Sequence, residues 1–490
     1  MRLPPFASKP ATPNDTGWLA WPDRRRWLRR FRQAVAASGL ELARLVSEEI
    51  GKPEGEAYVS EVLPLIAAIR WHERHAWRVL STRVAGGRPA WLVGRRVRVG
   101  RAPLGRVLVV ATWNYPVGLL GVQVVQAIVA GNRVTVKPSE RSPRSQDMLL
   151  RLAASCGLPK GWVCMSDASR AEGERLVMEG GFDKIIFTGG STTGERVAVA
   201  AARSLTPSVL ELSGADTAFV LEDADPARAA RSLWLACTMN AGQTCMAPRR
   251  ALVDRGIYRA FLDALAPLAA GVRPVRLVAA DEATRCHGLA TDAVGRGGRS
   301  LSGVLEPARD GWFRPLAIVD CPPQAELFEG SHFGPLLAVT PVAGVEQMLE
   351  LHAGVAHRLS VSVYTRRPSR WRRDPAFLSS LGASIVTFNE SVTPTGHPAV
   401  PIAGSGPSGW GSTRGEAGLL ELSRPLAVSE TASWTPAAVA PDGGVLRGLD
   451  RFVRWWNHAA APRHLSDPAR AGSGEVGETA RPERIKEMHR

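Results

Sequence analysis

Short apolar runs alternate with helical stretches from about residue 107 onward, and this alternation constrains the fold most. The first run, Val107-Leu108-Val109-Val110, is of the buried-strand type, and a helical stretch from Leu119 to Ala130 follows it. The pattern repeats with four further runs, which are Val134-Thr135-Val136, Trp162-Val163, Ile185-Ile186-Phe187 and Val209-Leu210-Glu211-Leu212. Strands that alternate with helices predict a parallel, doubly wound α/β sheet.

A second α/β region runs from about residue 215 to 395. Its expected strands are Ala218-Phe219-Val220-Leu221, Leu252-Val253, Leu337-Ala338-Val339-Thr340, Val361-Ser362-Val363-Tyr364 and Ile385-Val386-Thr387-Phe388. Before the first region, residues 18–80 carry apolar side chains at helical spacing. Residues 90–105 predict a strand pair, Trp91-Leu92-Val93 with Val97-Arg98-Val99.

Beyond about residue 430 the composition shifts to Ala, Pro, Gly, Ser and charged residues, which predicts a variable tail. One amphipathic helix is expected inside it, with an apolar face of Leu446, Leu449, Val453 and Trp456 and a basic flank of Arg447, Arg451 and Arg454. Such a helix can make a peripheral contact with a membrane surface. It can equally pack on the protein's own surface or on a second copy, and both interpretations stay open.

The net charge of +15 comes almost entirely from arginine, because the chain has only six lysines. These basic residues are scattered and no nucleic-acid-binding motif accompanies them, so we expect no nucleic-acid partner. The six cysteines show neither CxxC spacing nor an adjacent His cluster, which predicts neither a metal site nor a disulfide framework. With no signal-peptide pattern and no long apolar span, a reducing cytoplasm is the expected location.

Cys245 ends the segment Asn240-Ala241-Gly242-Gln243-Thr244-Cys245, in a loop rather than inside a helix. An isolated cysteine is more often a small buried apolar residue than a nucleophile, and Cys156 and Cys237 keep that interpretation. A nucleophilic thiolate would need hydrogen-bond donors for an oxyanion and a base that releases the acylated sulfur.

Two polar residues could supply those groups. Asn114, in Thr112-Trp113-Asn114-Tyr115-Pro116, follows the first strand of the doubly wound region, beyond whose carboxyl end ligands bind. Its amide could face an oxyanion, or the residue could simply form a turn. Glu211 lies inside an apolar strand, where a carboxylate is costly unless it is functional or has a buried structural partner.

A nucleotide-binding turn is the third candidate. Phe187-Thr188-Gly189-Gly190-Ser191-Thr192-Thr193-Gly194 follows a strand and opens a helix, a context in which backbone NH groups bind phosphate. Glycine-rich turns are common, so this pattern alone is a weak indication. Lys137 and Glu140, after the second strand, could hydrogen-bond a ribose or form an ordinary exposed charge pair.

Taken together, the segments resemble the aldehyde dehydrogenase superfamily over roughly residues 20–430. The ordered motifs are Trp-Asn-Tyr-Pro, Gly-Asn-x-Val-x-Val-Lys-Pro-Ser-Glu, Phe-Thr-Gly-Gly-x-x-x-Gly, Leu-Glu-Leu-x-Gly and Gly-Gln-Thr-Cys, then Phe333-Gly334-Pro335 and the glycine-rich residues 401–409. The Thr-Trp-Asn-Tyr-Pro form and the short N-terminal arm look closest to the class 3, fatty-aldehyde-type branch.

The resemblance implies an α/β, aldehyde dehydrogenase-like fold with a Rossmann-type doubly wound cofactor domain, an α/β catalytic domain and a small oligomerisation element. Residues 1–212 would bind NAD, with the strand pair near 90–105 as the oligomerisation element. Residues 213–400 would form the catalytic domain, residues 401–430 would return to the first two elements, and residues 431–490 would be the variable tail. A homodimer is also implied.

Individual roles follow from the same resemblance. Cys245 matches the nucleophile, Asn114 the oxyanion donor, and Glu211 the base that activates water. The cofactor contacts match Thr112, Trp113, Lys137, Glu140, Gly190 and Phe333, with Lys137 and Glu140 at the adenosine ribose, Gly190 near the pyrophosphate and Phe333 near the nicotinamide. Because Glu140 would repel a 2′-phosphate, NAD is the expected cofactor, with NADP as the alternative.

The expected reaction is therefore the NAD(P)-dependent oxidation of a small-molecule aldehyde to a carboxylic acid, through a thiohemiacetal and a thioester of Cys245. The chain departs from the family pattern at Ser331, where relatives carry the Glu that holds the nicotinamide ribose, and Glu329 is the nearest carboxylate in sequence. Ser213, Ala215 and Ile402-Ala403 are further departures. They motivate an alternative, a redox-impaired NAD-binding homologue with a regulatory role.

Overall fold

The computed structural model describes residues 20–87, 89, 92, 94–303, 305–434 and 443–457, without the side chain of Pro394. The chain divides into two compact units. The larger one comprises the described residues up to Gly86 and Val97–Ser429, and the smaller one comprises Gly87–Arg96 and the described residues from Glu430. The candidate site lies entirely within the larger unit.

A six-stranded sheet forms the first half of the larger unit, in the order β18-β7-β6-β3-β4-β5. Its strands are β3 (Arg106–Val110), β4 (Arg133–Lys137), β5 (Val163–Met165), β6 (Lys184–Thr188), β7 (Ser208–Glu211) and β18 (Gly409–Trp410). Strands β3 to β7 pair in parallel and β18 pairs antiparallel to β7. The predicted doubly wound sheet is confirmed, and its five parallel strands fall within two residues of the expected positions, whereas β18 was not predicted.

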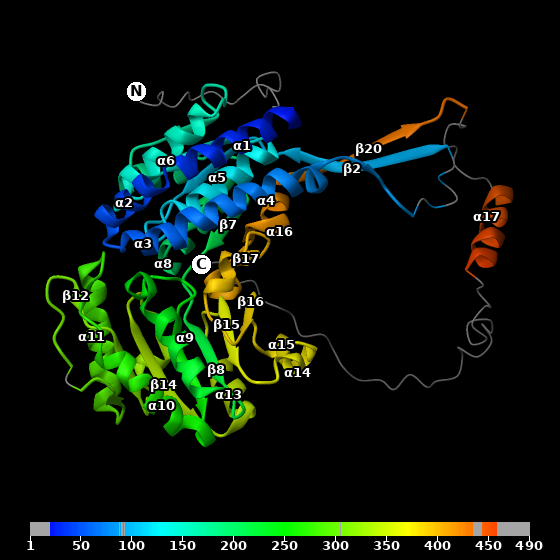
Figure 1. Ribbon diagram of the computed structural model, residues 1–490. Helices are drawn as coiled ribbons and strands as arrows, with labels where there is room; N and C mark the ends of the chain where they lie inside the picture. Colours follow the sequence, from blue (N-terminus) through cyan, green and yellow to red (C-terminus); the bar gives the residue numbers. More distant parts are fainter. Residues whose placement is uncertain are drawn as a thin grey trace, which may run out of the picture. The chain divides into compact units, whose positions relative to one another are not determined.

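Helices surround this sheet (Figure 1). They are α1 (Trp21–Ala37), α2 (Gly39–Ile50), α3 (Glu54–Ala57), α4 (Leu63–Leu80), α5 (Gly118–Ala130), α6 (Pro143–Ser155), α7 (Arg170–Glu179) and α8 (Ser191–Arg203), with a π-helical turn at Tyr58–Val62. Every residue of α5 is buried, because the helix packs between the sheet and α4. A Cβ at Gly121 would lie 2.6 Å from Leu65 of α4, so this glycine allows the close approach of the two helices.

A seven-stranded sheet forms the second half, in the order β11-β13-β14-β9-β8-β15-β16. Its strands are β8 (Asp216–Val220), β9 (Pro248–Asp254), β11 (Arg299–Ser300), β13 (Leu316–Val319), β14 (Leu336–Val342), β15 (Ser360–Tyr364) and β16 (Ile385–Phe388). All of its pairs are parallel except β11 with β13. The five strands expected in this region are therefore present.

The helices of this half are α9 (Pro226–Thr238), α10 (Arg255–Ala270), α11 (Ala280–Gly295), α12 (Glu326–Glu329), α13 (Gly344–Ala353), α14 (Pro368–Trp371) and α15 (Pro375–Ser380). Strands β10 (Val275–Arg276) and β12 (Trp312–Phe313) form a separate antiparallel pair. Trp234 on α9 is buried in the apolar core between the helices and the sheet. It is a core residue and does not line the cavity described below.

A three-stranded sheet, β1-β2-β20, joins β1 (Arg83–Val84), β2 (Arg95–Pro103) and β20 (Ser423–Thr431). The second half of the predicted strand pair is present in β2, but Trp91 and Val93 lie outside the described residues. The partner of β2 on one side is β1, in antiparallel register Arg83 to Val99. The sheet exposes several apolar side chains, which are Val84, Val99, Leu426 and Val428.

In the smaller unit, α17 (Gly443–Trp456) is the amphipathic helix expected in the tail. Its predicted apolar face, Leu446, Leu449, Val453 and Trp456, is between 44% and 59% exposed. Among the described residues no helix combines the length and apolar character that crossing a membrane requires.

Candidate active site

A cavity of about 430 Å³ contains most of the predicted site residues. Seven of them line it, namely Thr112, Trp113, Asn114, Gly190, Glu211, Cys245 and Phe333. They come from the ends of β3, β6 and β7, from the start of α8 and from loops next to the second sheet. Segments up to 221 residues apart in sequence thus form one site. Lys137 and Glu140 are not among the lining residues.

The Cys245 loop has an unusual backbone. Asn240, Ala241 and Gly242 have consecutive positive φ angles of 52°, 54° and 73° within the 3₁₀ turn Met239–Gly242. A Cβ at Gly242 would lie 2.3 Å from the backbone of Gly334, so only glycine fits there. This backbone strain is held by the surrounding structure and presents Cys245 to the cavity.

Arg249, near the start of β9, holds the same loop through hydrogen bonds. Its guanidinium donates to the carbonyl oxygens of Gly242 and Thr244 at 2.9 Å and to that of Gly334 at 2.9 Å. Gly334 belongs to the Phe333-Gly334-Pro335 segment. One buried arginine therefore ties the loop of the thiol to the segment of the predicted nicotinamide contact.

Asn114 points its amide toward the cysteine loop. Its Oδ1 accepts a hydrogen bond from the Thr112 hydroxyl at 2.8 Å, so the NH₂ end faces the other way. That NH₂ donates to the carbonyl oxygen of Gln243 at 3.1 Å. One amide hydrogen is used to hold the two loops together, and the other has no acceptor among the described residues.

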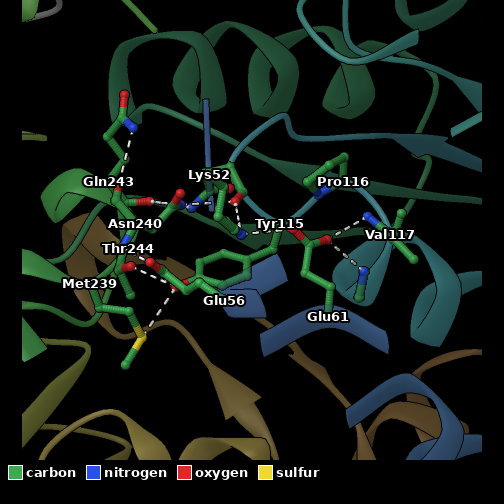
Figure 2. Close-up of polar contacts among 12 residues, drawn as sticks. Lys52, Glu56, Glu61, Tyr115, Pro116, Val117, Met239, Asn240, Gln243 and Thr244 are labelled. Atoms are coloured by element: carbon green, nitrogen blue, oxygen red, sulfur yellow. Dashed lines mark hydrogen bonds and ion pairs between the residues drawn. The ribbon is translucent and has the colours of Figure 1, made fainter. Parts of the chain in front are cut away.

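A buried ion pair fixes the loop that carries Asn114 (Figure 2). Lys52 Nζ lies 2.7 Å from Glu61 Oε1 and donates to the carbonyl oxygen of Asn114 at 2.9 Å. The other oxygen of Glu61 accepts from the backbone NH groups of Val117 and Gly118 at 2.8 and 3.1 Å, at the start of α5. The lysine also lies 3.9 Å from the ring centroid of Tyr115.

The network continues from these groups to the cysteine loop (Figure 2). The Tyr115 hydroxyl shares a 2.7 Å hydrogen bond with the Thr244 hydroxyl, and the Asn240 amide donates to the Asn114 carbonyl oxygen at 2.9 Å. Glu56 accepts from the backbone NH of Asn240 at 2.5 Å. Residues 112–117 and 239–245 thus form a single hydrogen-bonded body.

Glu211 is buried at the end of β7 and carries no salt bridge within the described part of the chain. Its Oε2 accepts from the Thr188 hydroxyl at 3.1 Å and the Gln123 amide at 3.4 Å, and its Oε1 accepts from the Thr413 hydroxyl. Burial raises the pKa of Glu211, opposed by Thr413 and the Arg414 charge. A carboxylate with a raised pKa can take a proton near neutral pH.

Burial also raises the pKa of the Cys245 thiol to about 12, and the charges of Glu211 and Asp216 act in the same direction. Arg414 and the backbone NH of Cys245 oppose them. In this arrangement the thiol is protonated at neutral pH, and it needs a base before it attacks. All six cysteines are free, and no cluster of metal-binding side chains occurs among the described residues.

The cofactor candidates fall into two groups. Gly190 caps the N-terminus of α8, where a Cβ would meet nothing within 4 Å, so that the helix end opens into the cavity. Lys137 and Glu140 form a 3.3 Å ion pair at the end of β4, and Arg170 pairs with Glu140 at 3.0 Å. Lys137 is buried and Glu140 is exposed, so the pair is not an ordinary exposed charge pair. The ribose contact stays a prediction.

The region around Ser331 holds a carboxylate from another element. Ser331 and Phe333 line the cavity, and Glu282 of α11 lines it beside them. Glu282 Oε1 accepts from the backbone NH of Phe333 at 2.6 Å. Glu329, the nearest carboxylate in sequence, is exposed and does not line the cavity. The departure at Ser331 therefore leaves a carboxylate in place, supplied by residue 282.

Several functional residues gave no recognisable signal in the sequence. Lys52 lies in the short loop between α2 and α3 and Glu61 in the π-helical turn Tyr58–Val62. In sequence both fall in the stretch predicted as helical, where a charged residue is ordinarily solvated. Thr413 and Arg414 come next to Glu211 only because β18 pairs with β7, with Gly409 opposite Glu211. Gly409 has φ +105°, and a Cβ there would lie 1.9 Å from the Leu210 carbonyl oxygen. The glycine-rich pattern of residues 401–411 could have indicated that the backbone there packs closely against another segment, but not that this segment is β7.

Comparison with known proteins extends this picture. The sequence model of the aldehyde dehydrogenase family matches residues 7–428. A geranial dehydrogenase from Castellaniella defragrans is 32% identical over 365 residues, which cover 71% of this chain and 75% of the relative. A putative aldehyde dehydrogenase from Burkholderia cenocepacia superposes with a TM-score of 0.78 at 28% identity, over 85% of this chain and 89% of that one. The structure of PnpE in complex with nicotinamide adenine dinucleotide gives 0.78 at 25% identity, over 86% and 87%.

Replacement of Lys52 by Met should destabilise the protein by about 3–5 kcal/mol, because the buried Glu61 carboxylate would lose its counterion. The measurement is urea unfolding followed by tryptophan fluorescence. Arg151→Met is the control, since it breaks an exposed ion pair with Asp147 that contributes less than about 1 kcal/mol. The double variant Lys52→Met, Glu61→Leu should recover most of the loss. A single variant as stable as the control would contradict this account of the network.

Proposed function

The chain belongs to the aldehyde dehydrogenase family, and we propose that Cys245, Asn114 and Glu211 carry out its oxidation of an aldehyde to a carboxylic acid. The supporting observation is that these three side chains line one cavity of about 430 Å³, although they come from distant parts of the sequence. NAD(P) is the hydride acceptor of the family's reaction, and PnpE, at 25% identity, binds nicotinamide adenine dinucleotide.

Acylation begins at the Cys245 sulfur. The thiol releases its proton to solvent and the sulfur adds to the aldehyde carbon, so that a C–S bond forms, the C=O π bond breaks and the carbonyl oxygen becomes an oxyanion. The free amide hydrogen of Asn114 and the backbone NH of Cys245 are the donors for that oxygen. Because the Lys52–Glu61 network fixes the Asn114 loop against the cysteine loop, these donors need no rearrangement during attack.

Bound NAD(P) would accept the hydride that leaves the carbon attached to sulfur, which yields a thioester. The residues present fit such a group. The start of α8 at Gly190 offers backbone NH groups to a diphosphate, and Trp113 and Phe333 form an edge-to-face pair with centroids 5.7 Å apart at the cavity wall. We propose that Glu282 takes the ribose contact that relatives assign to the residue at position 331.

Deacylation needs a base. Glu211 Oε2 would take a proton from a water molecule as its oxygen adds to the thioester, and collapse would break the C–S bond and return the electron pair to Cys245. The hydroxyl groups of Thr188 and Thr413 hold the carboxylate in place through their hydrogen bonds. The released product is a carboxylate.

Ser331 motivates the second candidate, a redox-impaired homologue with a regulatory role. The position of Glu282 in the cavity, bonded to Phe333, speaks against it.

Glu140 supports NAD as the preferred cofactor through its repulsion of a 2′-phosphate, while Arg170 beside it provides a cation that would favour NADP. Titration of the protein with NAD and NADP in parallel tests the cofactor preference and the impaired homologue. The cofactor that binds more tightly is the preferred one, and absence of binding of either at millimolar concentration would favour the impaired homologue.

We further propose the domain division at residues 212 and 400, membership of the class 3 branch and a cytoplasmic location. The chain passes from β7 of the first sheet to β8 of the second near residue 212, which supports the first proposal. The Thr-Trp-Asn-Tyr-Pro motif supports the second. Six free cysteines, which suit a reducing compartment, support the third.

Replacement of Cys245 by Ala should abolish aldehyde-dependent reduction of NAD(P), because no other thiol lies in the described cavity lining. Cofactor binding, followed by quenching of tryptophan fluorescence, should survive. Cys164→Ala, which removes a free thiol on β5, is the matched control and should keep wild-type activity. Turnover that persists in Cys245→Ala would rule out the thiol mechanism.

Replacement of Glu211 by Gln should lower steady-state turnover by about 10²–10⁴-fold and leave a single-turnover burst of reduced cofactor. The raised pKa keeps Glu211 protonated, and inactive as a base, until the pH passes above its ordinary value. Wild-type deacylation should therefore rise with pH through that pKa, and the variant should lose this rise. Glu179→Gln, at an exposed position on α7, is the control. A variant with an unchanged pH profile would exclude Glu211 as the base.

A homodimer and a peripheral membrane contact are also proposed, and one truncation tests both. The exposed apolar residues of β1, β2 and β20 support a second copy, and the apolar and basic sides of α17 support a lipid surface. A chain that ends at residue 434 should keep a dimeric mass in light scattering and lose co-sedimentation with anionic liposomes. A monomeric mass for the full-length chain would contradict the dimer, and no liposome binding by the full-length chain would contradict the contact.

A further inference from the structure

The cavity contains a cation that the reaction steps above do not use. Among the described lining residues, Arg414 is the only Lys or Arg, and the carboxyl groups present are Glu211 and Glu282. Its position between β19 (Ser412–Thr413) and α16 (Gly415–Glu421) requires φ +67°, which costs a non-glycine residue on the order of 1 kcal/mol. Its backbone NH donates to Gln126 Oε1 at 3.1 Å and holds this conformation.

The guanidinium is only partly satisfied. One terminal nitrogen donates to the Thr395 carbonyl oxygen, and Nε is buried without an acceptor within the described part of the protein. Glu211 does not compensate the charge by contact, because its oxygens accept from Thr188, Gln123 and Thr413 instead. A cation that is partly withdrawn from water and has no contacting anion is costly, and a ligand anion would reduce that cost.

A second unpartnered polar atom lies at the same end of the cavity. The Ser60 hydroxyl is buried without a hydrogen-bond partner among the described residues. Ser60 and Arg414 line the main cavity together, and both also line a small adjoining cavity of about 20 Å³, with Tyr115 and Leu119. None of the residues assigned to the cofactor lines that small cavity. The two donors therefore mark the part of the site that is left for the substrate.

We propose that Arg414 and Ser60 form a carboxylate-binding subsite, so that the preferred substrate is an aldehyde with a carboxylate at its other end. A carboxylate matches the planar fork of a guanidinium and accepts a further bond from a hydroxyl. One arginine balances one negative charge, whereas a phosphate dianion would keep an uncompensated charge in a cavity that already holds Glu211 and Glu282. Leu119, Val392 and Ile402 line the same cavity, and such apolar side chains suit a methylene chain.

The proposal rests on the proposed function, and the assay compares a linear aldehyde that ends in a carboxylate with the neutral aldehyde of the same length. Wild-type kcat/KM should favour the carboxylated aldehyde. Arg414→Met should lower the preference for the carboxylated aldehyde, which is the ratio of the two kcat/KM values, by on the order of 10- to 100-fold, as expected for loss of a hydrogen-bonded charge. Both substrates share the part of the loss that comes from Cys245 and Glu211, because the Arg414 charge lowers the pKa of both groups. Arg196→Met, at an exposed position on α8, is the control and should change neither.

Two further variants keep the test informative if Arg414→Met does not fold. Arg414→Lys should retain part of the preference because it keeps the charge, and Ser60→Ala should reduce the preference by a few fold. As a readout independent of turnover, the dicarboxylate of the same length should raise the melting temperature of Cys245→Ala. The double variant Cys245→Ala, Arg414→Met should not respond to it.

The outcomes separate this subsite from the reaction itself. Equal kcat/KM of the wild type for the two aldehydes would overturn the subsite and leave the thiol mechanism standing. An equal loss on both substrates in Arg414→Met would also overturn it, because that result assigns the arginine to the ionisation of Cys245. If the wild type oxidises neither aldehyde but Cys245→Ala still binds the dicarboxylate through Arg414, the proposed function fails and the subsite survives.

Discussion

The buried pair of Lys52 and Glu61 is the interaction on which the site depends. Two charges withdrawn from water are stable only when the opposite charge and hydrogen bonds replace their hydration. Here those hydrogen bonds come from the Asn114 loop and from the start of α5. The lysine bonds to Glu61 and to the Asn114 carbonyl oxygen, and Glu61 bonds to the backbone NH groups at the start of α5. Residues far from the thiol in sequence thereby decide where Asn114 lies.

The electrostatics of the cavity follow the same logic. Glu211 is buried and Cys245 is half-buried, and desolvation raises the pKa of both groups. For each group this favours the neutral form more than water does. The charge of Arg414 lowers the pKa of both groups, and an anion bound to Arg414 would weaken this effect. Occupation of the substrate end is thus coupled to the protonation of the thiol and of the carboxylate.

Much of the fold followed from periodicity, because strands that are buried on both faces are apolar throughout and short. Five of the six strands of the first sheet, five of the seven of the second, α5 and the tail helix were predicted from the residues alone. The ordered motifs pointed to Cys245, Asn114 and Glu211, and the structure places all three on one cavity. Lys52, Glu61, Glu282 and Arg414 could not be found this way. Their roles depend on contacts between residues that are 9 to 288 positions apart in sequence, and nothing local distinguishes them from surface charges.

Strand β18 pairs with β7, which lies far earlier in the sequence. This pairing determines when the site can form during translation. The first sheet can assemble from strands β3 to β7 as soon as residue 211 has left the ribosome, but Glu211 then lacks Thr413, its partner 202 residues later. Long-range contacts of this kind form last. A nascent chain therefore carries its thiol and its carboxylate long before the glycine-lined segment around Gly409 arrives to organise them. Its chemistry starts only when translation of the folded part is nearly complete.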